Sequence, residues 1–128
     1  MKQIKYFIIV LFLIPVIMSC KKVSGQIITL EREEIHFSQE GGSEEVRVVK
    51  GDFSEISIGP ISGTDYPPYE GDGEEYLKLD WIEVTKITSD KTISIMISVS
   101  PNVSGESRYA QVSVHSLDRG AIIKVYQN

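Results

Sequence analysis

The alternation of apolar and polar residues toward the C-terminus constrains the fold more than any other feature of this chain. In residues 92–99 every second position is apolar, namely Ile93, Ile95, Ile97 and Val99. Successive side chains of a β-strand point to opposite faces, so this spacing predicts a strand with one buried face. The pattern recurs in residues 108–116 and 121–125, with turn residues between the segments. The sequence therefore predicts three consecutive antiparallel strands here.

Shorter pieces of the same kind precede these strands. They lie at residues 27–30, 35–37 and 44–50 and around Ile56 and Ile58. β-branched residues and serines dominate, and no apolar stripe with helical spacing runs for three turns. The pattern predicts an all-β fold, an immunoglobulin-like antiparallel β-sandwich of about seven to eight strands.

The alternation breaks once, close to the single tryptophan. Leu77 and Leu79 share one parity, whereas Ile82 and Val84 share the other. A continuous strand cannot bury both pairs against one core, so a bulge or a strand break is expected just before Ile82. Two environments remain open for Trp81: exposure at the surface or sheet edge, or full burial in the sandwich.

The N-terminal segment has the composition of an export signal. Lys2 and Lys5 precede an apolar run at residues 6–18, and Cys20 follows that run as the only cysteine. A basic start and a short apolar core are typical of a secretory signal. The run is shorter than the roughly 20 residues that span a membrane.

Residues 17–20, Ile-Met-Ser-Cys, resemble the lipobox of bacterial lipoproteins. The resemblance implies cleavage before Cys20 and thioether lipidation of its sulfur; the alternative is an ordinary signal peptide with an incidental cysteine. Because Lys21 is not the aspartate that retains lipoproteins in the inner membrane, the resemblance implies the outer membrane. It favours the periplasmic face slightly over the cell surface. The expected organisation is a signal peptide (1–19), a lipid anchor with a short tether (20–26) and one sandwich domain (27–128).

Charge and cysteine content restrict the partners and the source of stability. Loss of residues 1–19 removes two of thirteen basic residues and none of the eighteen acidic ones, so the formal net charge changes from −5 to −7. An acidic chain repels phosphate backbones, which argues against a nucleic-acid partner. A lipidated single cysteine leaves no disulfide, so a packed core must stabilise the domain.

The segment between Ile58 and Trp81 is the best candidate for a binding site. It contains three of the six tyrosines, three prolines that stiffen it, and several carboxylates. Long loops on a rigid scaffold often carry function, and aromatic rings flanked by carboxylates suit a sugar. The residues expected to contact a ligand are Tyr66, Tyr69, Asp72, Tyr76 and Trp81. The alternative is a surface loop whose tyrosines pack on the edge of the sandwich.

Other chemistry has little support in the sequence. The acids of residues 70–75 are spaced for a weak calcium site, but they do not follow the EF-hand pattern, and a solvated acidic turn is the other interpretation. His36 and His115 are the only histidines, and both lie on alternating segments. Neither a G-x-S-x-G nor an H-E-x-x-H motif occurs. We therefore expect no enzyme, no metal and no cofactor.

Several landmarks occur in a recognisable order along the domain. They are Gly41-Gly42, Trp81, Asn102, Arg108 and Gln127. With these landmarks the chain resembles a BACON domain, an immunoglobulin-like module of exported proteins of gut Bacteroidetes, over roughly residues 27–128. The family is proposed to bind carbohydrate or mucin, because its members accompany glycan-degrading enzymes. The chain departs from the family at residues 59–76, where the family usually has a short connection.

These observations together predict a lipid-anchored envelope protein with a non-catalytic binding module for glycan or glycoprotein. Its contact surface is expected in the loop between Tyr66 and Trp81. The alternative is a structural or accessory lipoprotein that binds another envelope protein through that loop or a sheet edge. Coplanar exposed aromatic rings in the loop would favour the first, and a contiguous apolar patch would favour the second.

Overall fold

The computed structural model describes residues 27–62 and 69–128, which form nine β-strands in two sheets. The all-β sandwich is thus confirmed, and these residues hold no helix long and apolar enough to cross a bilayer. The predicted signal peptide, the predicted lipid anchor at Cys20 with its tether, and Tyr66 lie outside the described residues.

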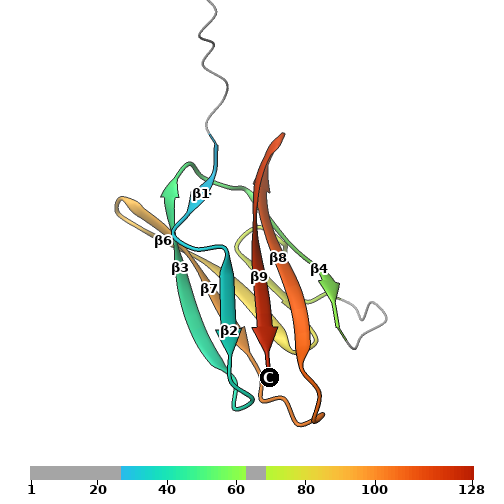
Figure 1. Ribbon diagram of the computed structural model, residues 1–128. Coiled ribbons are helices and arrows are strands. Elements are labelled where there is room, and N and C mark those ends of the chain that lie inside the picture. The colour runs from blue at the N-terminus through green and yellow to red at the C-terminus, as the bar shows by residue number, and fades with distance from the viewer. Residues whose placement is uncertain (1–26, 63–68) are drawn as a thin grey trace, which may run out of the picture.

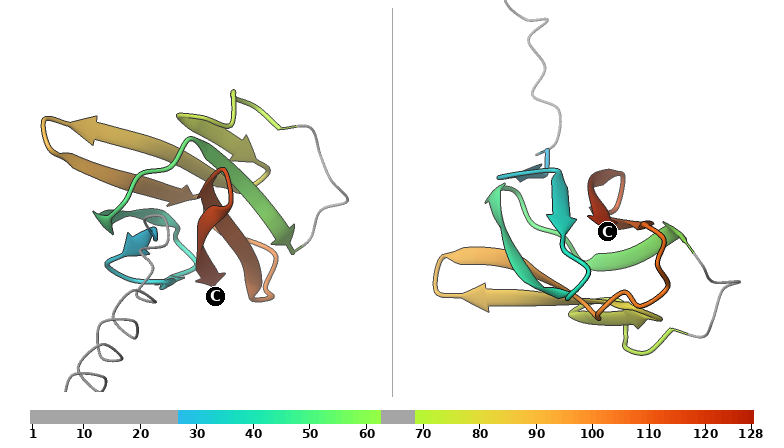
Figure 2. Two further views of the ribbon diagram at one scale, coloured as in Figure 1. Left: turned by 90° about the horizontal axis from the view of Figure 1, so that it is seen from above. Right: turned by 60° about the horizontal axis from the view of Figure 1, so that its bottom comes forward.

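One sheet has five strands and the other has four (Figures 1 and 2). The five-stranded sheet has the spatial order β1 (Thr29–Leu30), β3 (Gly42–Lys50), β7 (Thr92–Val99), β6 (Ile82–Ser89) and β5 (Tyr76–Leu79). The four-stranded sheet has the order β2 (Glu34–Phe37), β9 (Arg119–Gln127), β8 (Arg108–Ser116) and β4 (Glu55–Ile61).

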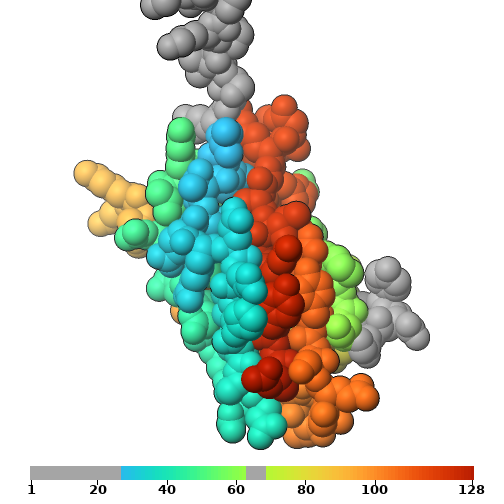
Figure 3. Space-filling model, in the orientation of Figure 1, coloured from blue at the N-terminus to red at the C-terminus, as the bar shows by residue number. Residues whose placement is uncertain are grey.

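The first two strands of the domain belong to different sheets. β1 pairs with β3, whereas β2, a few residues later, pairs with β9 in the other sheet (Figure 3). This switch gives two short strands on different sheets, and the β2–β9 pair is parallel, whereas the other paired neighbours are antiparallel. The strand number therefore exceeds the expected seven to eight, and the antiparallel pattern has one exception.

The core lies between the sheets and is built from the alternate positions that the sequence indicates. Ile95, Ile97 and Val99 are buried, as are the inward residues of β3, β4, β8 and β9. Ile93 has the same parity but is only half-buried. It lies toward the end of the β6–β7 hairpin, which projects beyond the facing sheet (Figure 2).

The predicted break before Ile82 is a hairpin turn. β5 ends at Leu79, β6 begins at Ile82, and these two residues pair directly. Asp80 makes the reversal with a φ of 53°, a left-handed conformation that aspartate adopts more readily than most residues. Because the chain reverses, the leucines of β5 and the apolar residues of β6 all face the core. Trp81 is also buried, with 5% of its surface exposed, so burial is correct and exposure is wrong.

Candidate functional site

The tyrosines of the predicted loop site do not form one platform among the described residues. Tyr69 is half exposed, and its hydroxyl donates a hydrogen bond to the Ile58 carbonyl at 2.8 Å. Tyr76 lies on β5 and is partly buried; this burial, followed by the charge of Glu83, raises the pKa of its hydroxyl. Tyr69 thus ties the loop to β4, which agrees with tyrosines that pack on the sandwich edge.

Asp72 organises the turn between the two tyrosines. Its Oδ1 accepts hydrogen bonds from the backbone N–H groups of Glu74 at 2.8 Å, Glu75 at 3.1 Å and Tyr76 at 3.4 Å. These bonds hold the pKa of the carboxyl below its usual range. No group of three or more metal-ligating side chains occurs in residues 27–62 and 69–128.

A small depression of about 330 Å³ lies beside Tyr69 and Asp72, between β4 and β5. The ligand-binding role of these two residues, and of Tyr66 and Tyr76, stays a prediction.

Trp81 has a structural role that leaves little of it for a ligand. Its Nε1 donates to the Ser62 carbonyl at 3.3 Å, and the Arg108 guanidinium lies over its ring at 4.3 Å. Burial lowers the pKa of Arg108, and the nearby Asp80 charge opposes this change. The guanidinium still remains charged at any ordinary pH. A ligand would have to displace Arg108 to stack on this tryptophan.

The remaining landmarks of the sequence pattern meet around the same arginine. Arg108 Nε donates to Gln127 Oε1 at 2.8 Å, and its Nη2 donates to the Ser100 carbonyl at 2.9 Å. Gln127, 1% exposed, donates from Nε2 to the carbonyls of Ser38 and Ser100. The buried Asn102 donates to two further carbonyls at this end of the sandwich. Arg108 and Gln127 thus form a hydrogen-bonded clasp between strand ends, with the Trp81 ring beneath the guanidinium and Asn102 at the same end of the sandwich.

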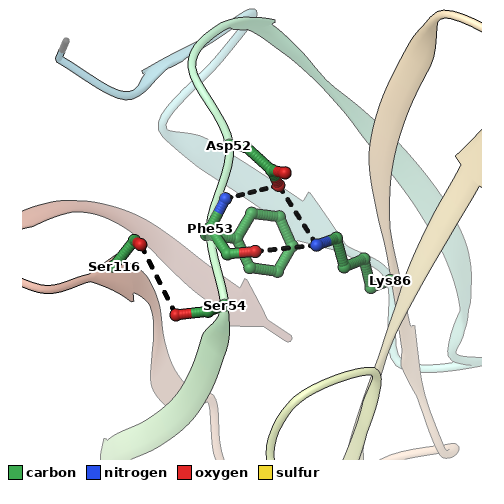
Figure 4. Close-up of polar contacts among 5 residues, drawn as sticks. All are labelled: Asp52, Phe53, Ser54, Lys86 and Ser116. Atoms are coloured by element: carbon green, nitrogen blue, oxygen red, sulfur yellow. Dashed lines mark hydrogen bonds and ion pairs between the residues drawn. The ribbon is translucent and has the colours of Figure 1, made fainter.

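A second polar cluster, around Lys86, also has a structural role (Figure 4). Lys86 on β6 points into the gap between the sheets, and its side chain is 15% exposed. Its Nζ donates to the Phe53 carbonyl at 2.7 Å and to Asp52 Oδ1 at 3.1 Å, and it lies 4.5 Å from the centre of the Phe53 ring. The lysine closes this part of the core and keeps its charge paired.

The outer face of the four-stranded sheet carries a row of three aromatic rings. His36 on β2, Tyr126 on β9 and Tyr109 on β8 occupy paired positions on neighbouring strands. The His36 and Tyr126 rings are stacked, with centroids 4.8 Å apart and planes 12° apart. The Tyr109 ring lies 5.1 Å from Tyr126 and is tilted by 49°. We refer to these three residues as the aromatic row.

A depression of about 570 Å³ adjoins the aromatic row on the same face. Its lining combines apolar surface with charged, amide and hydroxyl side chains and comes from β2, β8, β9 and the residue before β2. The lining residues are Glu33, Glu34, Gln111, Ser113, Val114, His115, Gly120, Ala121, Ile122 and Lys124. This face thus combines apolar ring surface with carboxylate, amide and ammonium groups within reach of one ligand.

The histidines take part in this face and are not isolated. His36 Nε2 lies 2.8 Å from Glu34 Oε1, and His115 Nδ1 lies 3.4 Å from Glu55 Oε2. Sequence reasoning placed these side chains on strands but did not identify the aromatic row. Alternation shows that a side chain points outward, whereas only the pairing of β2 and β8 with β9 brings the three rings together.

The fold is similar to that of a protein from Bacteroides thetaiotaomicron whose structure was determined by NMR. The TM-score is 0.54 with 15% sequence identity, and the match covers 85% of this chain and 92% of that chain. A likeness at this identity shows a shared fold. No family model and no curated protein matches the chain.

Proposed function

We propose that the chain is a lipid-anchored protein of the outer membrane whose β-sandwich is a non-catalytic, glycan-binding module. The outer face of the four-stranded sheet is the contact surface. The aromatic row beside a depression that Glu34, Gln111 and Lys124 help to line is the observation that supports this assignment. The resemblance to BACON domains and to the lipobox, stated from the sequence, points the same way.

The chemistry of the face suits a sugar. A sugar ring presents apolar C–H groups together with several hydroxyls, so it needs ring surface and hydrogen-bonding groups side by side. Tyr109 and Tyr126 supply both, since each is an apolar ring with a polar hydroxyl; the Tyr109 hydroxyl donates to Gln111 Oε1 at 3.1 Å and can still accept from a sugar hydroxyl. Gln111 and Lys124 form the next outward-facing pair along the same two strands, two residues from the tyrosines, and can donate to sugar oxygens.

The rigid placement of the aromatic row favours this face over the loop between Tyr66 and Trp81 as the glycan-binding surface. The aromatic row stands on hydrogen-bonded strands, so little side-chain entropy is lost when a ligand binds. The described loop tyrosines, Tyr69 and Tyr76, lie on different elements and no stacking brings their rings together. Exposed large apolar residues, including Val103, Leu117 and Val49, are scattered over different turns and strands of the described chain.

A glycan array that includes mucin-type glycans tests the proposal with the full-length protein and three variants. Tyr126→Ala removes the centre of the aromatic row, and Lys124→Ala removes one ammonium from the depression. Tyr66→Ala/Tyr69→Ala changes the predicted loop and leaves the sheet intact. Thermal melts followed by Trp81 fluorescence check that each variant is folded.

We expect the Tyr126→Ala variant to lose binding on the order of tenfold, which corresponds to an aromatic contact of about 1.4 kcal/mol. We expect a smaller loss for Lys124→Ala and none for the loop variant. If only the loop variant lost glycan binding, the binding site would lie in the loop and not on the sheet. Absence of glycan binding by the wild-type protein would reject the proposal and leave the envelope-protein partner as the function to pursue.

A further inference from the structure

Strand β2 forms an edge of the four-stranded sheet and carries backbone groups without a partner in the described part of the chain. β2 runs parallel to β9, and the carbonyls of Glu33 and Phe37 accept hydrogen bonds from that side at 2.8 and 3.3 Å. Alternate residues of a strand direct their backbone groups to opposite sides. The N–H and C=O groups of Glu34 and His36 therefore point away from β9, toward the open edge.

The chain protects its other sheet edges. β1 has only two residues, and beyond it the open side of β3 is covered by Glu31 and Arg32, which bond the backbone of Arg47 and Glu45. β5 is covered by Glu70, which exchanges two hydrogen bonds with Lys78 at 2.9 and 2.7 Å. β4 is covered by the same loop, since Ile56 N–H donates to the Gly73 carbonyl at 2.6 Å. An unprotected edge is a template for pairing with another strand, which makes β2 the place where this sandwich can add one.

We propose that β2 of one copy pairs in an antiparallel manner with β2 of a second copy. The two-fold axis passes beside Ile35, and the two four-stranded sheets join into one continuous sheet. In this register Glu34 of each copy lies opposite His36 of the other copy. Each such pair exchanges two backbone hydrogen bonds, so the four open groups of each β2 are all satisfied.

The side chains of this edge are self-complementary in the same register. Glu34 and His36 are both exposed on the outer face, where their side chains already lie 2.8 Å apart within one copy. In the pair, each carboxylate faces the imidazole of the other copy, a favourable cross-strand combination. A shift by two residues would oppose Glu34 to itself or His36 to itself and would leave half of the open groups without a partner.

A second copy fits this edge better than an unrelated strand because a two-fold pairing needs a patch that complements itself. Ile35 lies on the axis with its side chain in the core, so no apolar surface must be uncovered. The pairing rests on the backbone groups of β2 and does not need a bound glycan; Tyr109 and Tyr126 lie on the face of the sheet, and Glu34 and His36 are shared by the face and the edge.

A charge swap tests the pairing. The full chain, purified in detergent, is analysed by sedimentation equilibrium up to about 1 mM, the concentration range of a weak four-residue contact. The variants are Glu34→Lys, His36→Glu and the double variant Glu34→Lys/His36→Glu. Glu83→Lys, on β6 of the other sheet, is the matched charge control. His36→Pro removes an N–H that points away from β9, and Trp81 fluorescence verifies that it stays folded.

We expect a dimer for the wild type and the Glu83→Lys control. His36→Glu opposes two carboxylates twice per dimer, and Glu34→Lys removes the acceptor that faces each imidazole, so the dissociation constant should rise on the order of tenfold for each single variant. The double variant should return to the wild-type value, and His36→Pro should be monomeric. A wild-type chain that is monomeric at every concentration, or single variants that dimerise as the wild type does, would overturn the pairing.

Discussion

Replacement of Arg108 by methionine should destabilise the sandwich far more than its position near the surface suggests. The arginine joins β8 to β9 through Gln127 at 2.8 Å and to the end of β7 through the Ser100 carbonyl at 2.9 Å, and it covers the Trp81 ring. Methionine keeps most of the aliphatic stem over that ring but offers no donor.

The expected loss of stability follows from the hydrogen-bond acceptors that lose Arg108 as their donor. The Ser100 carbonyl keeps the hydrogen bond from Gln127 Nε2, so its loss is partial. Gln127 Oε1 loses the donor that it has in the described chain while its residue is 1% exposed, which costs about 1–3 kcal/mol. The lost cation–π contact adds about 0.5–1 kcal/mol. We expect a total of about 2–4 kcal/mol, a large share of a typical stability of about 5–15 kcal/mol.

Urea unfolding followed by the fluorescence of Trp81, the single tryptophan, measures this loss directly. Arg47→Met, at an exposed position of β3, is the matched control and should change the stability by less than about 0.5 kcal/mol. In a Gln127→Leu background, Arg108→Met should cost at least about 1 kcal/mol less, because the buried Gln127 Oε1 is absent there, and the Ser100 carbonyl, which loses both side-chain donors, belongs to an exposed residue that water can reach. Equal costs in the two backgrounds, or a cost as small as that of the control, would refute this reasoning.

Four further substitutions probe the turns and the Lys86 cluster. The pKa of Asp72 is lower in the folded state than in the unfolded state, so the ionised carboxylate stabilises the fold above about pH 4. This stabilisation is lost as the pH falls through the pKa of the folded state. The difference in melting temperature between wild type and Asp72→Ala should therefore shrink below about pH 4. Gly41→Ala should cost about 1–3 kcal/mol, since its φ is 81° and an added Cβ would lie 2.5 Å from a β7 carbonyl oxygen. Gly105 has the same φ, but an added Cβ there would meet no atom within 4 Å, so Gly105→Ala should cost less in the same thermal melts. Equal losses of stability would exclude the contact with the β7 carbonyl as the cause. Lys86→Met should lower the unfolding free energy by about 1–2 kcal/mol, because the Phe53 carbonyl loses its charged donor, and an unchanged urea midpoint would contradict this role.

Local patterns predicted the strands well because alternation is a property of neighbouring residues. Val46, Ile58, Val112 and Val125 are buried as their parity indicates. The opposed parities of the leucines of β5 and the apolar residues of β6 also located the irregularity before Ile82, but whether it was a bulge or a break was decided by the structure, where β5 and β6 form a hairpin.

The sequence patterns did not predict which strands, far apart along the chain, pair with one another. The burial of Trp81 depends on Arg108, 27 positions away in the sequence, which lies over its ring. The aromatic row depends on β2 lying parallel to β9, and no local pattern reports which strand becomes a neighbour. Tyr69, placed in a binding loop from composition, has its hydroxyl occupied by the β4 backbone.

The sequence by itself determined that this chain forms an all-β sandwich and which side chains face its core, because strand geometry ties each residue to one of two faces. The tertiary structure decided which outward side chains become neighbours: the His36, Tyr126 and Tyr109 rings on one face, and the clasp of Arg108 and Gln127 at one end. Strand order and register set those distances, and both are settled by packing between segments far apart along the chain.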